Sequence, residues 1–464
     1  MNRIAIIGGG ISGLSAAFAL EEHRRNGVAV EYVLYESSSH LGGVLRTEQI
    51  DGCIVEAGPD SFLTEKPWAT DLCRAVGLTD QLVGSNDADR KTHIIVGGKL
   101  VPIPDGLMFL VPTRILPTGA SPLFSLKTKL RMAQEMLLPP HPTGHDESVA
   151  AFVERHYGNE MVHRLADPLL SGVYGGEAAN LSVRAVLPRF AEMERTHGSL
   201  GRAMLAARKK MAKAPAKQPP SSLFTSLKNG MQQLADAVAA HLDHSSLLTN
   251  ARVQAIQPEG ESWIVSAGLK SDEFDAVILA VPAYSAARLL SLCAPELSAE
   301  LSAIEYSSSI TVGLGYDGAV RQSLPPGFGF LVPRSEDKRL LAATFVHNKF
   351  PHRAPADRAL LRCFFAGRNA ATVWDLTDSE IIAVVRDELR QILNLTADPL
   401  FFRVYKWKSA MAQYAVGHLD RLDRIERLRQ QLAGIALAGN AYHGIGVPDC
   451  VRSGRDAVAQ VLSQ

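Results

Sequence analysis

The chain of 464 residues has few cysteines and no long hydrophobic run. Its five cysteines, Cys53, Cys73, Cys293, Cys363 and Cys450, are scattered, odd in number and without a C-x-x-C pair. We therefore expect neither a disulfide framework nor a metal site, and the pattern fits a reducing cytoplasm. No apolar stretch approaches the roughly 18 to 20 residues that a membrane-spanning helix needs. We expect a protein that is soluble or lies at most on a membrane surface.

The chain also lacks an excess of charge of either sign. Lysine plus arginine and aspartate plus glutamate number 48 each, and the sequence pI is about 7.2. This balance gives no electrostatic case for nucleic acid as a partner. At 464 residues the chain exceeds the usual size of one hydrophobic core, which predicts two intertwined domains.

A glycine-rich turn follows the apolar run at residues 4–7. In such a pattern Gly8 permits a tight turn, Gly10 lets a pyrophosphate approach the backbone, and Gly13 lets the next helix lie close to the sheet. The phosphates are then held at the positive N-terminus of that helix. The predicted dinucleotide cradle consists of Gly8, Gly9, Gly10, Ile11, Ser12 and Gly13.

A second strand is predicted at residues 30–35 and ends at Glu36 and Ser37. Glu36 lies 23 residues after Gly13, about where a carboxylate that binds the adenosine ribose belongs. The alternative is an ordinary turn with a solvated Glu36. A secretory signal is a further interpretation of residues 4–20, but three consecutive glycines would break its helix, so we expect no export.

Two later segments offer backbone for cofactor contact. A glycine pair precedes Arg46, which could face a phosphate or a flavin carbonyl or could lie on the surface. A short strand then ends in a Gly58-Pro59 turn, whose bare backbone suits a flat ring. The cofactor residues expected here are Gly43, Val44, Arg46, Gly58, Pro59, Asp60 and Ser61.

Prolines punctuate residues 85–142, which suits an inserted lobe. Within it, the apolar residues 107–111 predict either core packing or contact with a membrane or a hydrophobic substrate. Helical patterns follow at residues 148–157 and 160–170. The basic, proline-bearing segment 209–220 is either a solvated linker or a contact for an acidic lipid or partner.

From residue 226 the chain returns to the pattern of a nucleotide domain and then changes to an antiparallel substrate sheet. The two domains are thus interleaved along the sequence. The expected elements are a helix at 232–241, strands at 251–256, 262–269 and 276–281, strands at 310–316, 340–346 and 360–365, and a helix at 378–393.

The C-terminal segment contains a second strand, glycine turn and helix. Gly439 follows the strand, and Gly446, Val447 and Pro448 open the helix, which creates another helix start that favours an anion. A cofactor that touches both ends of the chain must be long. FAD fits this requirement better than NAD.

With these residues in view, the chain resembles the oxygen-dependent protoporphyrinogen and coproporphyrinogen oxidase family, within the flavin amine oxidase and phytoene desaturase superfamily. The resemblance covers essentially all residues. The glycine turn, Glu36 and the C-terminal segment mark the superfamily. The segments that narrow it to the porphyrinogen oxidases are 167–176, 181–184, 194–200 and 226–231.

The resemblance implies an α/β fold. A Rossmann-type FAD-binding domain is interleaved with a mixed α+β substrate domain and a helical inserted lobe. The implied boundaries are 1–84, 226–285 and 407–464 for the FAD-binding domain, 85–225 for the lobe and 286–406 for the substrate domain.

The resemblance also assigns site residues. It implies that the backbone of Val253 contacts the adenine and that Trp407 lies beside the flavin. It places Arg90, with Lys66 as a second candidate, at a substrate propionate, and the Gly172 backbone against a pyrrole ring. A surface arginine is the alternative for Arg90. No catalytic side chain is implied, because the flavin carries the chemistry.

The implied reaction is the oxidation of a porphyrinogen by non-covalently bound FAD, with oxygen as acceptor and hydrogen peroxide as product. The pattern around residues 60–66 and 104–106 is closer to the soluble bacterial branch, whose substrate is protoporphyrinogen IX or coproporphyrinogen III. A cytoplasmic haem-biosynthesis enzyme follows, with room for peripheral contact with the inner membrane face or with another enzyme of the pathway. The alternatives are a flavin amine oxidase and a cofactor-free binding protein of the same fold.

Overall fold

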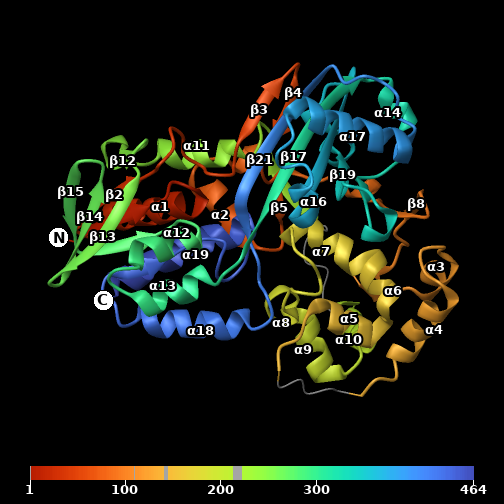
Figure 1. Ribbon diagram of the computed structural model, residues 1–464, viewed down its shortest axis with the longest axis horizontal. Coiled ribbons are helices and arrows are strands. Elements are labelled where there is room, and N and C mark those ends of the chain that lie inside the picture. Colours follow the sequence, from red (N-terminus) through yellow and green to blue (C-terminus); the bar gives the residue numbers. More distant parts are fainter. Residues whose placement is uncertain (1, 109, 140–144, 213–221, 464) are drawn as a thin grey trace. The chain divides into compact units, whose positions relative to one another are not determined.

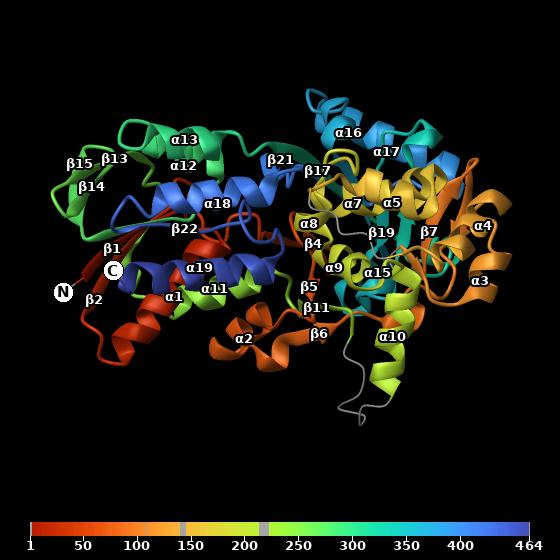
Figure 2. The same cartoon turned by 90° about the horizontal axis from the view of Figure 1, so that it is seen from below.

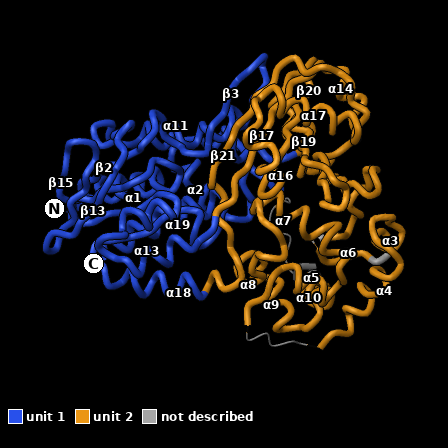
Figure 3. Tube along the Cα trace, viewed as in Figure 1, with its two compact units in different colours: residues 1–85, 222–305, 420–464 blue, residues 86–221, 306–419 orange. Residues whose placement is uncertain are grey.

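The computed structural model describes residues 2–108, 110–139, 145–212 and 222–463. These residues form two compact units (Figure 3). Unit 1 contains residues 1–85, 222–305 and 420–464, and unit 2 contains residues 86–221 and 306–419. Each unit therefore combines segments that are far apart in the sequence.

A parallel five-stranded sheet forms the centre of unit 1. The N-terminal strand lies inside the sheet and pairs on both sides with strands from later segments. All four pairings between neighbouring strands of this sheet are parallel. Parallel neighbours of this kind need crossover connections, which helices supply. In spatial order the strands are β12 (Leu247–Leu248), β2 (Val30–Tyr35), β1 (Asn2–Ile7), β16 (Ala276–Leu279) and β22 (Ile435–Leu437).

Helices cover one face of this sheet. Ile4 and Ile6 of β1 point into a core shared with helices from three chain segments, whereas their neighbours Ala5 and Ile7 lie outside that core. This alternation is that of a strand buried on both faces. The helices of this core are α1 (Ile11–Arg25), α2 (Pro67–Ala75), α11 (Gln232–Ala240) and α19 (Val447–Leu462).

Smaller elements complete unit 1. An antiparallel three-stranded sheet contacts β1 and β16, and two short sheets follow the strand β2 along the chain. The antiparallel sheet is β13 (Val253–Glu259), β14 (Ser262–Ala267) and β15 (Lys270–Phe274); the short sheets are β3 (Thr47–Ile50) with β4 (Cys53–Glu56), and β5 (Phe62–Leu63), β11 (Phe224–Leu227) and β6 (Leu82–Gly84). The other helices are α12 (Ala283–Leu290), α13 (Pro295–Ser302) and α18 (His418–Arg429).

Unit 2 contains a seven-stranded sheet. It is largely antiparallel, but β7 pairs with β18 in parallel. The order is β21 (Phe401–Ala412), β17 (Tyr306–Asp317), β20 (Arg358–Ala366), β19 (Ala342–Phe345), β18 (Gly329–Leu331), β7 (Thr92–Val96) and β8 (Lys99–Pro102). The helices that follow these strands are α14 (Val320–Ser323), α15 (Val346–Lys349), α16 (Gly367–Ala371) and α17 (Asp378–Leu393).

The rest of unit 2 is a helical lobe with its own core (Figure 1). Leu110 and Val111 belong to this core, so core packing holds for these two members of the apolar segment 107–111. Phe109 and residues 213–220 of the basic segment lie outside the described residues. The lobe contains β9 (Leu107–Met108), β10 (Val111–Pro112), α3 (Ile115–Ala120), α4 (Leu126–Glu135), α5 (Val149–Tyr157), α6 (Asn159–Met161), α7 (Asp167–Tyr174), α8 (Val183–Val186), α9 (Pro188–His197) and α10 (Leu200–Ala212).

The helix expected at residues 160–170 is divided. A π-helical turn at 162–166 separates α6 from α7. The two units also have boundaries that differ from those expected for the domains. The strands β7 and β8 of the expected lobe join the seven-stranded sheet, residues 407–419 lie in unit 2, and residues 286–305 lie in unit 1.

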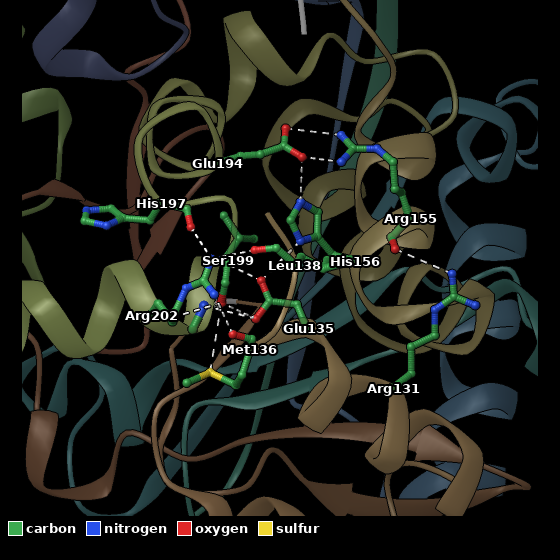
Figure 4. Close-up of polar contacts among 12 residues, drawn as sticks. Arg131, Glu135, Met136, Leu138, Arg155, His156, Glu194, His197, Ser199 and Arg202 are labelled. Atoms are coloured by element: carbon green, nitrogen blue, oxygen red, sulfur yellow. Dashed lines mark hydrogen bonds and ion pairs between the residues drawn. The ribbon is translucent and has the colours of Figure 1, made fainter. Parts of the chain in front are cut away.

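A buried charged cluster joins three helices of the lobe (Figure 4). The ring of His156 lies between two carboxylates, with Nδ1 at 3.2 Å from Glu135 Oε1 and Nε2 at 3.1 Å from Glu194 Oε1. Glu135 also accepts from Ser199 Oγ at 2.8 Å, and Arg155 pairs with Glu194. Both ring nitrogens can donate to a carboxylate only in the imidazolium form.

The pKa values of this cluster follow from the same contacts. Burial opposes the charged form of His156, but the hydrogen bonds to Glu135 and Glu194 outweigh it and raise the pKa of His156 above 6.5. Burial likewise raises the pKa of Glu194, but the hydrogen bonds from His156 and Arg155 outweigh burial and lower this pKa to about 2. Both shifts favour the charged forms of His156 and Glu194.

We expect this cluster to make the stability of unit 2 fall as pH rises above neutrality. The contribution of His156 is fully present below its unfolded-state pKa, about 6.5, and is lost as pH rises through its higher folded-state pKa. His156→Gln leaves two buried carboxylates without this cation and should lower the free energy of unfolding by roughly 3–5 kcal/mol near pH 6. The measurement is urea unfolding of both proteins from about pH 6 to pH 9.

The difference between the two proteins should shrink with rising pH. His163→Gln, at an exposed histidine of the same lobe, is the matched control and should leave both stability and its pH dependence unchanged. A difference between wild type and His156→Gln that stays constant across this range would contradict a charged His156 in the folded protein.

Candidate functional site

The turn between β1 and α1 is closed by glycine backbone. Gly8 has φ +109°, a conformation that side chains disfavour, and its N–H donates to Tyr35 O at 2.8 Å. A Cβ at Gly13 would stand 1.9 Å from Gly8 O. Only glycine at position 13 therefore lets α1 begin directly on this turn.

An open space lies in front of the start of α1. A Cβ built on Gly10 meets no heavy atom within 4 Å, and one built on Gly43 meets only Gly10 Cα, at 3.2 Å. The two loops are held together by the bond from Gly42 N to Gly9 O at 2.8 Å. Bare backbone N–H groups at a helix start beside an open space are the donor set that a pyrophosphate needs.

The Glu36 carboxylate lies at the edge of this turn. Its Oε2 accepts from Gly9 N at 2.8 Å, and its Oε1 accepts from Ser38 N at 2.7 Å and from Ser37 Oγ at 3.3 Å. A carboxylate has about four acceptor positions, so capacity remains for a ribose hydroxyl. Ala251, two residues before Val253, donates its N–H to the backbone carbonyl of Glu36 at 2.8 Å.

The helix α19 packs directly against α1 (Figures 1 and 2). A Cβ at Gly454 would stand 2.1 Å from Ser12 O, and Ser15 Oγ donates to Val451 O at 2.8 Å. Gly446 is the N-cap of α19, with Val447 and Pro448 in its first turn. The structure therefore brings the starts of the two helices, one from each end of the chain, into the same unit.

The loops after β2 and β4 also lie close together. A Cβ at Gly58 would stand 1.9 Å from Val44 O, so the turn at Gly58 and Pro59 packs on the backbone of the earlier loop. Arg46 is half exposed and has Glu48 Oε1 at 3.6 Å from its guanidinium.

Three further predicted residues of unit 1 are held by hydrogen bonds of their own. Asp60 accepts from Ser61 Oγ through Oδ1 at 2.7 Å and from Ser226 Oγ through its carbonyl at 2.8 Å. Gly439 follows β22 with φ +135°, and its N–H donates to Ser453 Oγ at 3.0 Å. Their cofactor contacts stay predictions.

Lys66 has a carboxylate partner inside unit 1. Its Nζ lies 2.6 Å from Asp449 Oδ2, and the Asp449 side chain is only 4% exposed. Asp449 is not among the site residues expected from the sequence. The signal that points to it is an acidic residue two positions after the first residue of a Pro-containing helix start, where a side chain can accept from the N-cap backbone.

The other predicted residues belong to unit 2. Gly172 is exposed on α7, and a Cβ there would meet Leu331 Cδ2 at 4.0 Å. Trp407 pairs with Ser309 across β21 and β17 and is half buried. Arg90 is half exposed, with a guanidinium nitrogen 3.9 Å from Asp87 Oδ2.

In the described part of the chain, no group of three or more histidine, cysteine, aspartate or glutamate side chains is placed to hold a metal ion. The five cysteines are free thiols. Among residues 2–463 outside the gaps, no helix has both the length and the apolar character needed to cross a membrane.

Residues 11–462 match the profile of a family described as flavin containing amine oxidoreductase. The chain belongs to this family. The cofactor implied by this family is a flavin, and the helix starts, the open space at Gly10 and the Glu36 carboxylate fit a flavin nucleotide. The expected fold class, a Rossmann-type domain interleaved with a substrate domain, is confirmed.

Curated relatives extend over the whole chain. The coproporphyrinogen III oxidase of Bacillus subtilis (strain 168) is 33% identical and the alignment covers 99% of this chain and 98% of that protein. The coproporphyrinogen III oxidase of Propionibacterium freudenreichii is 32% identical, with 99% and 90% covered. The chloroplastic protoporphyrinogen oxidase of Nicotiana tabacum is 29% identical, with 98% and 84% covered. The resemblance to the porphyrinogen oxidases is thus confirmed.

Solved structures agree on the fold. A candidate protoporphyrinogen oxidase from Exiguobacterium sp. 255-15 superposes with a TM-score of 0.88 at 29% identity, covering 100% of this chain and 99% of that one. A putrescine oxidase bound to putrescine has a TM-score of 0.71 at 18% identity, with 100% and 99% covered. The second likeness shows the fold alone.

We expect Gly10→Val to fold normally and to lose the flavin. Gly10 has φ −70° and ψ 177°, which any residue adopts, and its Cβ direction is open, so valine should leave the thermal unfolding midpoint of flavin-free protein unchanged. The same side chain would occupy the space in which a pyrophosphate approaches the backbone. The measurement is flavin absorbance per protein together with a thermal scan.

Gly13→Ala is the matched control with the opposite outcome. Its Cβ would collide with Gly8 O, so it should lower the unfolding midpoint even without flavin. Normal flavin content in Gly10→Val would show that the cradle lies elsewhere.

Proposed function

We propose that this protein is an FAD-dependent porphyrinogen oxidase that prefers coproporphyrinogen III to protoporphyrinogen IX. The carrying observation is how much of each relative the match covers: 98% and 90% of the coproporphyrinogen III oxidases of Bacillus subtilis and Propionibacterium freudenreichii, against 84% of the tobacco chloroplastic protoporphyrinogen oxidase. The likeness to a putrescine oxidase extends to the fold only and gives no comparable support to an amine substrate.

The residues of unit 1 would hold FAD without a covalent bond. The backbone at Gly10 and the start of α1 would bind the pyrophosphate, and Glu36 the ribose. Cys450 lies near the start of α19, and burial raises the pKa of its thiol to about 12. A thiol that stays protonated is a poor nucleophile, which supports non-covalent binding.

Bound FAD would supply the redox chemistry, accepting hydride equivalents from the porphyrinogen and passing them to oxygen. The chain itself then needs to bind and orient a flat macrocycle and its propionates. For these tasks we propose the exposed backbone at Gly172 with the neighbouring Leu331, and the guanidinium of Arg90. A planar guanidinium can bind a carboxylate through two parallel hydrogen bonds.

We also propose that one face of the lobe contacts an anionic membrane surface. Leu126 and Leu130 are one helical turn apart on α4 and are 73% and 58% exposed. Leu116 of α3 and Leu137 are 85% and 80% exposed, and α3 and α4 lie side by side in both views (Figures 1 and 2). Exposed Lys127 and Arg131 stand on the same helix as the first pair.

The porphyrinogen assignment is tested with the two reduced substrates offered separately. We expect porphyrin fluorescence to rise faster with coproporphyrinogen III, and acid precipitation to release FAD into the supernatant.

Arg90→Ala should lower kcat/KM by about 10- to 150-fold, as expected for the loss of roughly 1.5–3 kcal/mol from a charge-assisted hydrogen bond, without changing FAD content. Flavin reduction by polyamines instead of porphyrinogens would overturn the proposal in favour of an amine oxidase.

The membrane proposal is tested by co-sedimentation with vesicles rich in phosphatidylglycerol. Leu126→Ser together with Leu130→Ser should weaken binding at least tenfold, because each buried leucine contributes about 1.5–3 kcal/mol. Leu269→Ser, at a fully exposed leucine of unit 1, is the control and should change nothing. Equal binding of all three proteins would show that this face is not the contact.

A further inference from the structure

An ion pair connects the start of α2 to the first turn of α19. Lys66 is the N-cap of α2, and its ammonium lies 2.6 Å from Asp449 Oδ2 in α19. The lysine side chain is 35% exposed, whereas the carboxylate is 4% exposed. A carboxylate so deeply buried is costly without a cation beside it.

Asp449 in turn shapes the loop that opens α19. Its Oδ2 accepts from Gly446 N at 3.3 Å, so the side chain of the third helical residue caps the backbone of the N-cap residue. A Cβ at Gly444, where φ is +129°, would stand 2.3 Å from Asp449 Cγ, which shows how closely the loop folds over this side chain. The position of the loop therefore depends on where the Asp449 carboxylate is held.

Lys66 is the main counter-charge of Asp449. The next cation, Arg452, has its Nη2 3.9 Å from Asp449 Oδ1. Its guanidinium is engaged elsewhere, because it lies 4.4 Å from the ring centroid of Trp68 and donates to His443 O at 2.7 Å. The Trp68 contact also fastens α19 to α2, so two contacts join the same pair of helices.

We propose that the Lys66–Asp449 pair sets the position and the charge of the α19 start, and through it the affinity for FAD and the potential at which the bound flavin is reduced. The inference rests on the proposed function, and on the expectation from the sequence that FAD also contacts the start of α19 at Gly446, Val447 and Pro448. An unbalanced carboxylate in the first turn would offset the positive helix end and oppose both an anionic cofactor and the addition of electrons to it. Lys66 is thus a positioning residue and not a cation for a substrate propionate.

The test measures the FAD dissociation constant and the flavin midpoint potential in purified variants. Lys66→Met should raise the dissociation constant about tenfold, equivalent to about 1.4 kcal/mol, and should shift the potential to more negative values. Asp449→Asn removes the opposite charge and should shift the potential to more positive values. Lys66→Arg, and the double variant Lys66→Met with Asp449→Asn, should lie close to wild type in potential.

The double variant keeps the test valid if Lys66→Met alone does not fold, because it leaves no lone buried carboxylate. Arg74→Met is the matched control: it removes a cation from the same helix α2, but from an exposed pair in which the nitrogen lies 2.8 Å from Asp71 Oδ1. It should change neither the dissociation constant nor the potential.

Different failures point to different errors. If Lys66→Met raised only the KM for porphyrinogen, with the dissociation constant and potential unchanged, Lys66 would be a substrate cation and the inference would be wrong. If Lys66→Met and Asp449→Asn moved the flavin potential in the same direction, the pair would have a purely structural role and the inferred effect of its charge would be wrong. Wild-type protein that bound no FAD would overturn the proposed function itself.

Discussion

The contact between the backbones of α1 and α19 is the constraint on which unit 1 depends. Gly13 lets α1 start on the Gly8 turn, and Gly454 lets α19 approach Ser12 O, where any side chain would stand about 2.1 Å from that oxygen. Residues from the two ends of the chain are therefore packed against each other. The same close approach brings both helix starts into one unit, which suits a long dinucleotide.

Unit 2 is held together in a different way. Its lobe contains a buried cluster of Glu135, His156 and Glu194, in which charge replaces the small side chains that join the helices of unit 1. A second polar contact joins the lobe to the sheet, since Gln413 Nε2 donates to Tyr174 O at 2.7 Å and to Ser307 Oγ at 3.0 Å. These contacts fix the end of α7 and with it the exposed backbone at Gly172. Satisfied polar networks of this kind specify one arrangement of helices, and an unpaired member would be costly.

The flavin-containing amine oxidoreductase fold supports several chemistries, so the fold by itself does not select the substrate. Putrescine oxidase and the candidate protoporphyrinogen oxidase both superpose along the whole chain. What favours a porphyrinogen is the likeness in sequence to coproporphyrinogen III oxidases over the whole length. Lys66, which the resemblance assigns to a substrate propionate, pairs with the buried carboxylate of Asp449, and this partner is visible in the tertiary structure alone.

The strands, helices and glycine turn of this chain could be predicted from the sequence, because these elements follow from local rules. Residues 30–35 form a strand and 378–393 a helix with the bounds expected from their patterns, and Gly8 has the positive φ of the tight turn that the glycine spacing predicts. How distant segments combine could not be predicted in this way and is visible in the tertiary structure alone. The strands β7 and β8 are part of the seven-stranded sheet, and Asp449 forms an ion pair with Lys66, 383 positions away in the sequence. Pairing across such distances leaves no periodicity in the chain, since it depends on packing and on the cost of leaving a buried charge alone.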